Sequence, residues 1–207
     1  MKVSVLGATG YAGAELLRIL YQHPQAEVVH ITSESHTGET IASLYPHLRG
    51  LYDMKLESMQ DIRSIGEDSD FIFIGLPHGH AMEVARTLAD LPVRIIDLGA
   101  DFRFDDTDVY EAWYHVKHTY QDAPRVYGLA ELYRDAVRSA KIIGNAGCFT
   151  TASILALAPL AKSHLIDTKS IIVDAKSGVT GAGRSPKLAN HFPELYDNFS
   201  AYNVAHH

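Results

Sequence analysis

Several features are scarce in this 207-residue sequence, and each shortage excludes a class of protein. The chain has one cysteine, so it forms no internal disulfide, and that thiol is either a buried small side chain or a reactive group. No apolar run approaches the roughly 18 residues that cross a bilayer. The first residues begin a strand pattern without the basic start of a signal peptide. We therefore expect a cytoplasmic protein that does not bind membranes.

Positive charge is also scarce. Lysine and arginine number 18 against 25 aspartates and glutamates, which gives a formal net charge of −7, so nucleic-acid binding is not expected. The 12 histidines lack the spacing of metal-binding motifs such as H-E-x-x-H, and we predict no metal site. Apolar residues make up 46% of the chain, which is enough for the core of a globular protein.

Short apolar runs alternate with helical patterns along most of the chain. Strands are predicted at residues 2–6, 28–32, 71–75, 94–97 and 141–144. Helices are predicted at residues 12–22, 82–89 and 150–161. This alternation is typical of a parallel sheet with right-handed crossovers, so we predict an α/β fold with a doubly wound sheet of Rossmann type. Residues 101–131 lack a sustained period and are expected to form loops and short helix.

The first predicted strand leads directly into a glycine-rich turn. Gly7, Gly10 and Gly13 have the spacing G-x-x-G-x-x-G between a strand and a helix. In such a turn the first glycine allows the sharp bend, the second lets backbone N–H groups approach a pyrophosphate, and the third lets the helix pack against the sheet. Glycine is also common in ordinary strand–helix turns. The strand before it and the helix after it favour dinucleotide binding.

The end of the second predicted strand bears on the choice of cofactor. Thr32, Ser33 and Ser35 supply hydroxyls that suit the 2′-phosphate of NADP. Glu34 is the kind of acid that binds the ribose of NAD, or it could simply point to solvent. We favour NADP, with NAD as the alternative.

The cysteine lies at a second strand–helix turn. Cys148 follows Gly147, and Thr150 or Thr151 is expected to cap the helix. The N-terminus of a helix stabilises a thiolate through its dipole and its free N–H groups. Cys148 is therefore predicted to be a nucleophile, and the alternative is a buried structural cysteine.

Six motifs together resemble the N-acetyl-γ-glutamyl-phosphate reductases, a branch of the semialdehyde dehydrogenase family. They are GATGYAG (7–13), LPHGHA (76–81), DLGADFR (97–103), YGLAEL (127–132), GNAGC (144–148) and SGVTGAGR (177–184). The resemblance implies that NADPH reduces N-acetyl-γ-glutamyl phosphate to the semialdehyde, with release of phosphate, in arginine biosynthesis. It also implies that the substrate passes through a thioester on Cys148.

Further site residues come with the resemblance. His207 aligns with the first histidine of a catalytic H-R-H-x-P-E segment. The alternative is that the two histidines at the end of the sequence belong to a disordered terminus or to the remnant of a tag. Arg103 is a candidate for binding an anionic group of the substrate, and the alternative is a surface ion pair with Asp101. His78 and His80 follow the third predicted strand and could cap the next helix. The predicted cofactor-binding residues are Gly7, Thr9, Gly10, Tyr11, Ala12, Gly13, Ser33, Ser35, Pro77, Ser177 and Gly178. The predicted substrate-binding residues are Arg103, Asn145 and Arg184, the two arginines as clamps for anionic groups.

Two domains are expected. Residues 1–147 are predicted to bind the dinucleotide, and residues 148–207 to begin an α+β substrate and dimerisation domain that contains a strand at 170–176. Because chains of the family continue beyond the histidine segment, the resemblance implies that this second domain is incomplete here and that the protein is a homo-oligomer. Two other functions stay open, an aspartate-semialdehyde-type dehydrogenase and a non-catalytic dinucleotide-binding module.

Overall fold

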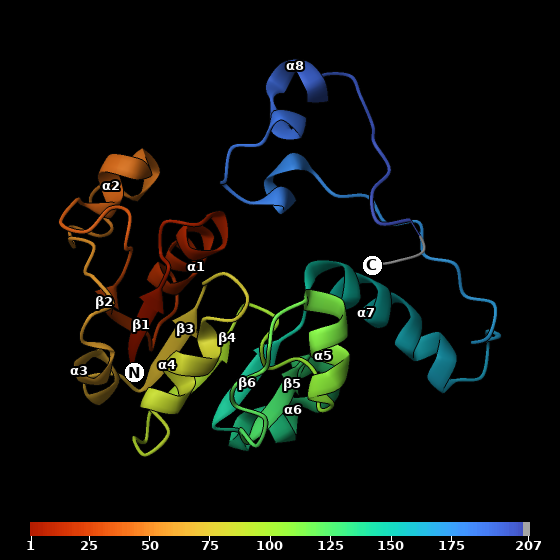
Figure 1. Ribbon diagram of the computed structural model, residues 1–207, viewed down its shortest axis with the longest axis horizontal. Helices are drawn as coiled ribbons and strands as arrows, with labels where there is room; N and C mark the ends of the chain where they lie inside the picture. Colours follow the sequence, from red (N-terminus) through yellow and green to blue (C-terminus); the bar gives the residue numbers. More distant parts are fainter. Residues whose placement is uncertain (205–207) are drawn as a thin grey trace. The chain divides into compact units, whose positions relative to one another are not determined.

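A computed structural model describes residues 1–204 of the protein (Figure 1). It divides into two compact units, Met1–Val173 and a second unit that begins at Asp174. Among the described residues, no helix has both the length and the apolar character needed to cross a bilayer. The domain boundary expected after residue 147 stays a prediction.

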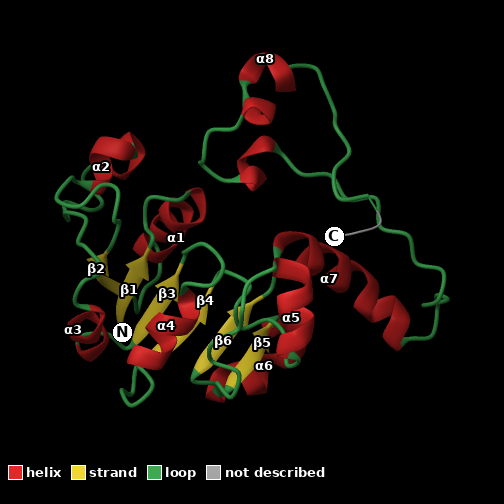
Figure 2. Cartoon of the chain, viewed as in Figure 1, coloured by secondary structure: helices red, strands yellow, loops and turns green. Residues whose placement is uncertain are grey.

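A six-stranded parallel sheet forms the centre of the first unit (Figure 2). Its strands are β1 (Lys2–Leu6), β2 (Glu27–Ile31), β3 (Phe71–Ile74), β4 (Arg94–Asp97), β5 (Arg125–Gly128) and β6 (Ile142–Asn145). Their order in the sheet is β2-β1-β3-β4-β6-β5, and every pair is parallel. The chain moves outward from β1 to β2 and then crosses to β3 on the other side of β1. The doubly wound α/β fold is therefore confirmed, with its switch point between β1 and β3, where such sheets bind ligands.

Seven helices accompany the sheet in the first unit. They are α1 (Tyr11–Tyr21), α2 (Ile41–Leu44), α3 (Ile62–Glu67), α4 (Ala81–Thr87), α5 (Thr107–Tyr114), α6 (Ala130–Ser139) and α7 (Cys148–Lys162), with a short 3₁₀ turn, η1, at Pro46–Leu48. The described part of the second unit has two 3₁₀ turns, η2 (Val179–Ala182) and η3 (Leu188–Asn190), and one short helix, α8 (Phe192–Leu195).

Alternate side chains of β1 enter two separate cores. Val3 and Val5 pack with Leu17 of α1 on one face of the sheet. Leu6 and Ile74 pack against α3 and α4 on the other face, where α4 lies in front of the sheet in Figure 1. Full burial of one such side chain contributes roughly 2 kcal/mol. Both faces are therefore covered, as a parallel sheet requires.

The predicted strands and helices lie within two residues of the observed ones except in two segments. Residues 101–131 contain the edge strand β5, which was not expected. Its four residues are all half-buried, so they carry no alternating pattern. The strand predicted at 170–176 does not form. Ile172 is 92% exposed there, and no described strand lies beside the segment to pair with its N–H and C=O groups.

Candidate active site

Steric constraints shape the turn between β1 and α1. Gly7 has φ +80°, and a Cβ there would lie 2.4 Å from the carbonyl oxygen of Gly75. A Cβ on Gly13 would lie 2.7 Å from the carbonyl oxygen of Gly7, so the start of α1 touches the turn itself. Gly10 is the N-cap of α1, and a Cβ there would come no closer than 3.8 Å to another atom. The fold thus requires glycine at Gly7 and Gly13, whereas the backbone at Gly10 is left uncovered.

Hydroxyl groups gather beside this turn, where β2 ends. Thr9 Oγ1 lies 2.9 Å from Ser33 Oγ, which lies 3.5 Å from Ser35 Oγ. Ser33 is buried and Ser35 is exposed. The Glu34 carboxylate accepts a hydrogen bond from the backbone N–H of Met59 at 2.6 Å. The acid that could have selected NAD is therefore engaged by the protein backbone, and three hydroxyls remain together at the strand end.

Asp101 joins the loops that follow β3 and β4. Its side chain is buried, with 2% of the residue exposed. It accepts hydrogen bonds from the backbone N–H groups of Gly79 (2.8 and 3.0 Å) and Ala81 (3.0 Å), and from the Tyr110 hydroxyl (2.8 Å). The surface ion pair considered for Asp101 and Arg103 is therefore wrong, because the carboxylate lies inside the protein and binds other donors.

Asp97, the last residue of β4, is a second buried carboxyl group. It accepts hydrogen bonds from the N–H groups of Gly99 (2.8 Å) and Asp101 (3.1 Å). Burial, and after it the negative charge of Asp101, raise the pKa of Asp97 to about 7. These bonds fix the bend that carries the chain from β4 to Arg103.

Arg103 connects this loop to the turn that carries the cysteine. Its Nε donates to the carbonyl oxygen of Asn145 at 2.7 Å, and its Nη2 donates to that of Leu98 at 3.0 Å. Its Nη1 would lie 3.1 Å from a Cβ on Gly147, the residue before Cys148. One nitrogen of the guanidinium thus lies at the cysteine turn, while the other two anchor the side chain.

The loop reaches this turn by crossing β6 at Gly144. A Cβ on Gly144 would lie 2.0 Å from the carbonyl oxygen of Phe102, so the two backbones are in direct contact. Sequence reasoning missed this crossing. A glycine inside a strand is the signal that could have revealed it, because such a residue often marks the close approach of another backbone.

Cys148 is the first residue of α7, and Gly147 is its N-cap. The helix therefore begins two residues earlier than expected, and the predicted caps Thr150 and Thr151 are wrong. Thr150 Oγ1 instead donates to the carbonyl oxygen of Gly147 at 2.9 Å. The thiol is free and exposed, unlike that of a buried structural cysteine. Asn145 ends β6, and its amide donates to the carbonyl oxygen of Ala146 at 3.1 Å.

The loop after β3 brings Pro77 and His78 to the same edge of the sheet. Pro77 is exposed, and the His78 ring makes an edge contact with Tyr114, with centroids 4.7 Å apart. His80 is the N-cap residue of α4, but its side chain makes no capping hydrogen bond. The interpretation of His80 as a side-chain cap is therefore wrong, and Asp101 supplies an acceptor there instead.

Four predicted site residues lie elsewhere in the chain. Ser177, Gly178 and Arg184 belong to the second unit, where Gly178 is the N-cap of η2. His207 lies outside the described residues. The roles expected for these four residues stay predictions.

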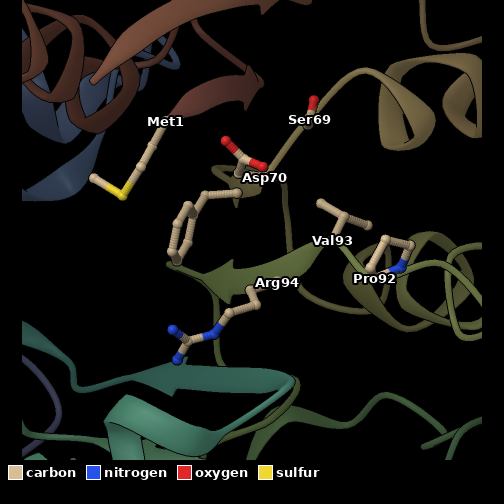
Figure 3. Close-up of a pocket in the computed structure, with 7 residues that line it drawn as sticks. Met1, Ser69, Asp70, Pro92, Val93 and Arg94 are labelled. Carbon is tan, nitrogen blue, oxygen red and sulfur yellow. The ribbon is translucent and has the colours of Figure 1, made fainter. Parts of the chain in front are cut away.

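A cavity of about 370 Å³ lies at the amino ends of β3 and β4 (Figure 3). The glycine turn and Cys148 follow the carboxyl ends of β1 and β6 instead. The cavity is lined by Met1, Ser69, Asp70, Phe71, Pro92, Val93 and Arg94. Asp70 accepts a hydrogen bond from the N–H of Lys2 at 2.8 Å, and Arg94 donates to the carbonyl oxygen of Ala140 at 2.8 Å. Its charged groups thus bind the backbone, and we do not count this cavity as part of the active site.

Two family models match the chain. The semialdehyde dehydrogenase NAD-binding domain matches residues 2–140, and the semialdehyde dehydrogenase dimerisation domain matches residues 148–207. Among curated proteins, the N-acetyl-gamma-glutamyl-phosphate reductases of Pelotomaculum thermopropionicum and Desulforudis audaxviator are 53% and 50% identical over the whole chain. The chain spans 60% of the length of these relatives.

Solved structures show the same fold at low sequence identity. Aspartate semialdehyde dehydrogenase II of Vibrio cholerae, complexed with ASA, is 20% identical with a TM-score of 0.58, covering 78% of this chain and 46% of that one. Aspartate semialdehyde dehydrogenase of Candida albicans, with NADP, is 18% identical with a TM-score of 0.57, covering 80% and 48%.

Proposed function

The chain belongs to the semialdehyde dehydrogenase family, and from that premise we propose that it reduces N-acetyl-γ-glutamyl phosphate to the semialdehyde, with release of phosphate, in arginine biosynthesis. The observation that carries this proposal is the exposed thiol of Cys148 at the N-terminus of α7, with Arg103 directed at the same turn. The relatives at 53% and 50% identity favour the N-acetylglutamyl substrate over an aspartyl one.

The chemistry proposed for Cys148 follows from its position. The thiolate attacks the carbonyl carbon of the acyl phosphate, the bond from that carbon to the phosphate oxygen breaks, and a thioester remains on Sγ. The first N–H groups of α7 stabilise the thiolate and the oxyanion that forms during attack. A reduced nicotinamide, when bound, would supply hydride to the thioester carbonyl. Loss of the C–S bond then gives the aldehyde and returns the thiolate. In this scheme His207 exchanges protons with the sulfur and the oxyanion.

We assign the cofactor to the switch point between β1 and β3. The uncovered backbone at Gly10 and the N-terminus of α1 would hold the pyrophosphate. The hydroxyls of Thr9, Ser33 and Ser35 favour NADP over NAD, because they can donate to a 2′-phosphate while Glu34 is engaged elsewhere. The remaining residues proposed to line the cofactor are Gly7, Tyr11, Ala12, Gly13, Pro77, Ser177 and Gly178.

Substrate binding is assigned to Arg103, Asn145 and Arg184. Arg103 is supported by its Nη1, which lies beside Gly147, the residue before Cys148. We also propose that the protein is a homo-oligomer, since the second matching model describes a dimerisation domain. The cytoplasmic location expected from the sequence stays a prediction.

The reverse reaction gives a direct test. The 207-residue chain is mixed with N-acetylglutamate semialdehyde and NADP, with and without phosphate, and NADPH formation is followed by absorbance. We expect reduction that requires phosphate, and a loss of at least ~10³-fold in the Cys148→Ser variant with nucleotide affinity unchanged. Aspartate semialdehyde serves as the competing substrate. Reduction without phosphate or without the thiol would contradict the mechanism, and loss of nucleotide binding in Cys148→Ser would show that the thiol is structural.

A further inference from the structure

The buried carboxylate of Asp101, in the loop after β4, binds both the loop after β3 and helix α5. A buried carboxylate is costly unless donors satisfy its oxygens. It accepts hydrogen bonds from two backbone N–H groups, of Gly79 and Ala81, and from the Tyr110 hydroxyl. Its own carbonyl oxygen lies 2.8 Å from Nε2 of His118. Tyr110 and His118 thus hold Asp101 in place, and its carboxylate binds the loop after β3.

Asp101 binds that loop at two points, Gly79 and Ala81. Gly79 has φ +94°, a left-handed conformation, and its N–H contacts both carboxylate oxygens. Ala81 is the first residue of α4, whose N-cap, His80, provides no side-chain acceptor. Asp101 therefore caps α4 from a position 20 residues later in the chain. A negative charge at this end of a helix is favourable.

The loop after β4, which carries Asp101, also contacts the turn before Cys148. Two residues after Asp101, the Arg103 guanidinium binds the carbonyl oxygen of Asn145 and lies beside Gly147. The segment from Asp101 to Arg103 therefore contacts the loop after β3, at Gly79 and Ala81, and the chain at the end of β6, at Gly144 and Asn145. These contacts lie at the ends of three neighbouring strands, β3, β4 and β6.

We propose that Asp101 is a positioning residue. It holds the loop after β3 in its cofactor-binding conformation and fixes the position of that loop relative to Arg103 and the turn before Cys148. The proposal rests on the function proposed above, because it takes the Pro77–Gly79 loop as a cofactor contact. Asp101 itself touches neither substrate nor cofactor in this arrangement. Its removal should act through the loop.

The test compares Asp101→Ala with Tyr110→Phe. The first variant removes the acceptor of both backbone N–H groups, whereas the second removes one donor to the same carboxylate and leaves those two bonds in place. Hydrogen–deuterium exchange of the peptide that spans residues 76–82 is measured without nucleotide, and NADP affinity is then measured by calorimetry. We expect exchange to be at least ~10-fold faster and affinity about 10-fold weaker in Asp101→Ala. Both quantities should stay near wild type in Tyr110→Phe.

Asp101→Asn keeps one acceptor oxygen and provides a folded variant if Asp101→Ala fails to fold. We expect changes of the same sign but smaller size. Unchanged exchange in both Asp101 variants would overturn the proposal, as would equal losses of affinity in Asp101→Asn and Tyr110→Phe, which would indicate general destabilisation. A wild-type chain that binds no dinucleotide would instead overturn the proposed function, and with it the cofactor part of this proposal, while the exchange data still report on the loop.

Discussion

Two helices begin at glycine caps of nearly equal geometry, yet their surroundings differ. Gly10 caps α1 with φ −72° and ψ 161°, and Gly147 caps α7 with φ −69° and ψ 160°. α1 then buries Leu17 and Leu20 against the sheet. In the described part of the chain, none of the 15 residues of α7 is buried. The geometry of a cap is thus local, while burial depends on partners. The first turn, between β1 and α1, lies beside a packed core. The second turn, between β6 and α7, places its thiol on a helix whose apolar side chains are not buried.

The largest expected effect is on the first turn. Gly7→Ala should lower the free energy of unfolding by about 4 kcal/mol, because the Cβ combines left-handed strain with a 2.4 Å approach to Gly75. Gly38→Ala is the matched control, since Gly38 has φ +86° but no atom within 4 Å, and should cost about 1 kcal/mol. Urea denaturation measures both. Equal losses would mean that the turn moves to admit the side chain.

The packing of the two helices can be compared with one substitution in each. Leu17→Ala in α1 should cost about 3 kcal/mol, because Leu17 is fully buried. Leu160→Ala in α7 should cost less than about 0.5 kcal/mol, because Leu160 is 40% exposed. Thermal and urea unfolding of the two variants provide the measurement. A large loss in Leu160→Ala would show that α7 is covered in solution, for example by a second copy of the chain.

The ligand site of the first turn can be blocked without altering the second. Gly10→Val should weaken NADP binding by about 100-fold, roughly 2.7 kcal/mol, because the turn admits a Cβ at Gly10 but the methyl groups would occupy the space needed by a pyrophosphate. Calorimetry gives the affinity. The alkylation rate of Cys148 is the control and should stay at its wild-type value. Unchanged NADP affinity would remove the glycine turn from the proposed cofactor site.

The last prediction concerns the pH dependence of stability and the loop between the two turns. The pKa of Asp97 is raised to about 7 by burial first and by Asp101 second, so the native state keeps a proton that the unfolded chain loses near its usual pKa of 3.8. Stability should therefore fall as the pH rises from about 4 to about 7, by at least roughly 1 kcal/mol. Asp97→Asn should show a flatter profile in urea titrations across this range. Parallel profiles in the two proteins would contradict the assignment.

The fold of the first unit could be predicted largely because local signals agree there. At β1 and α1 the strand pattern, the glycine turn and the helical period point to the same structure. β5 escaped prediction because an edge strand of four half-buried residues carries no alternation. The strand expected at 170–176 failed for the opposite reason, since its apolar pattern was clear but no described strand pairs with it. Pairing partners lie far away in the sequence, and a local pattern does not contain them.

The candidate site divides in the same way. The steric need for glycine at Gly7 and Gly13 and the position of Cys148 at a helix start follow from local patterns and agree with the structure. The burial of Asp101 could not be predicted, because an acid in a short loop usually faces water, and its donors at Gly79 and Ala81 come from another loop. The start of α7 was misplaced because its cap is a glycine rather than a threonine.

The contact between Gly144 and the Phe102 carbonyl bears on how tolerance to mutation should be interpreted. Every substitution at Gly144 adds a Cβ about where that oxygen lies, so a saturation screen would score the position as intolerant. Nothing in the proposed chemistry uses Gly144. A map of essential positions would therefore score Gly144 as high as Cys148. The two residues are needed for different reasons, because Cys148 supplies a reactive thiol and Gly144 leaves room for the backbone of Phe102.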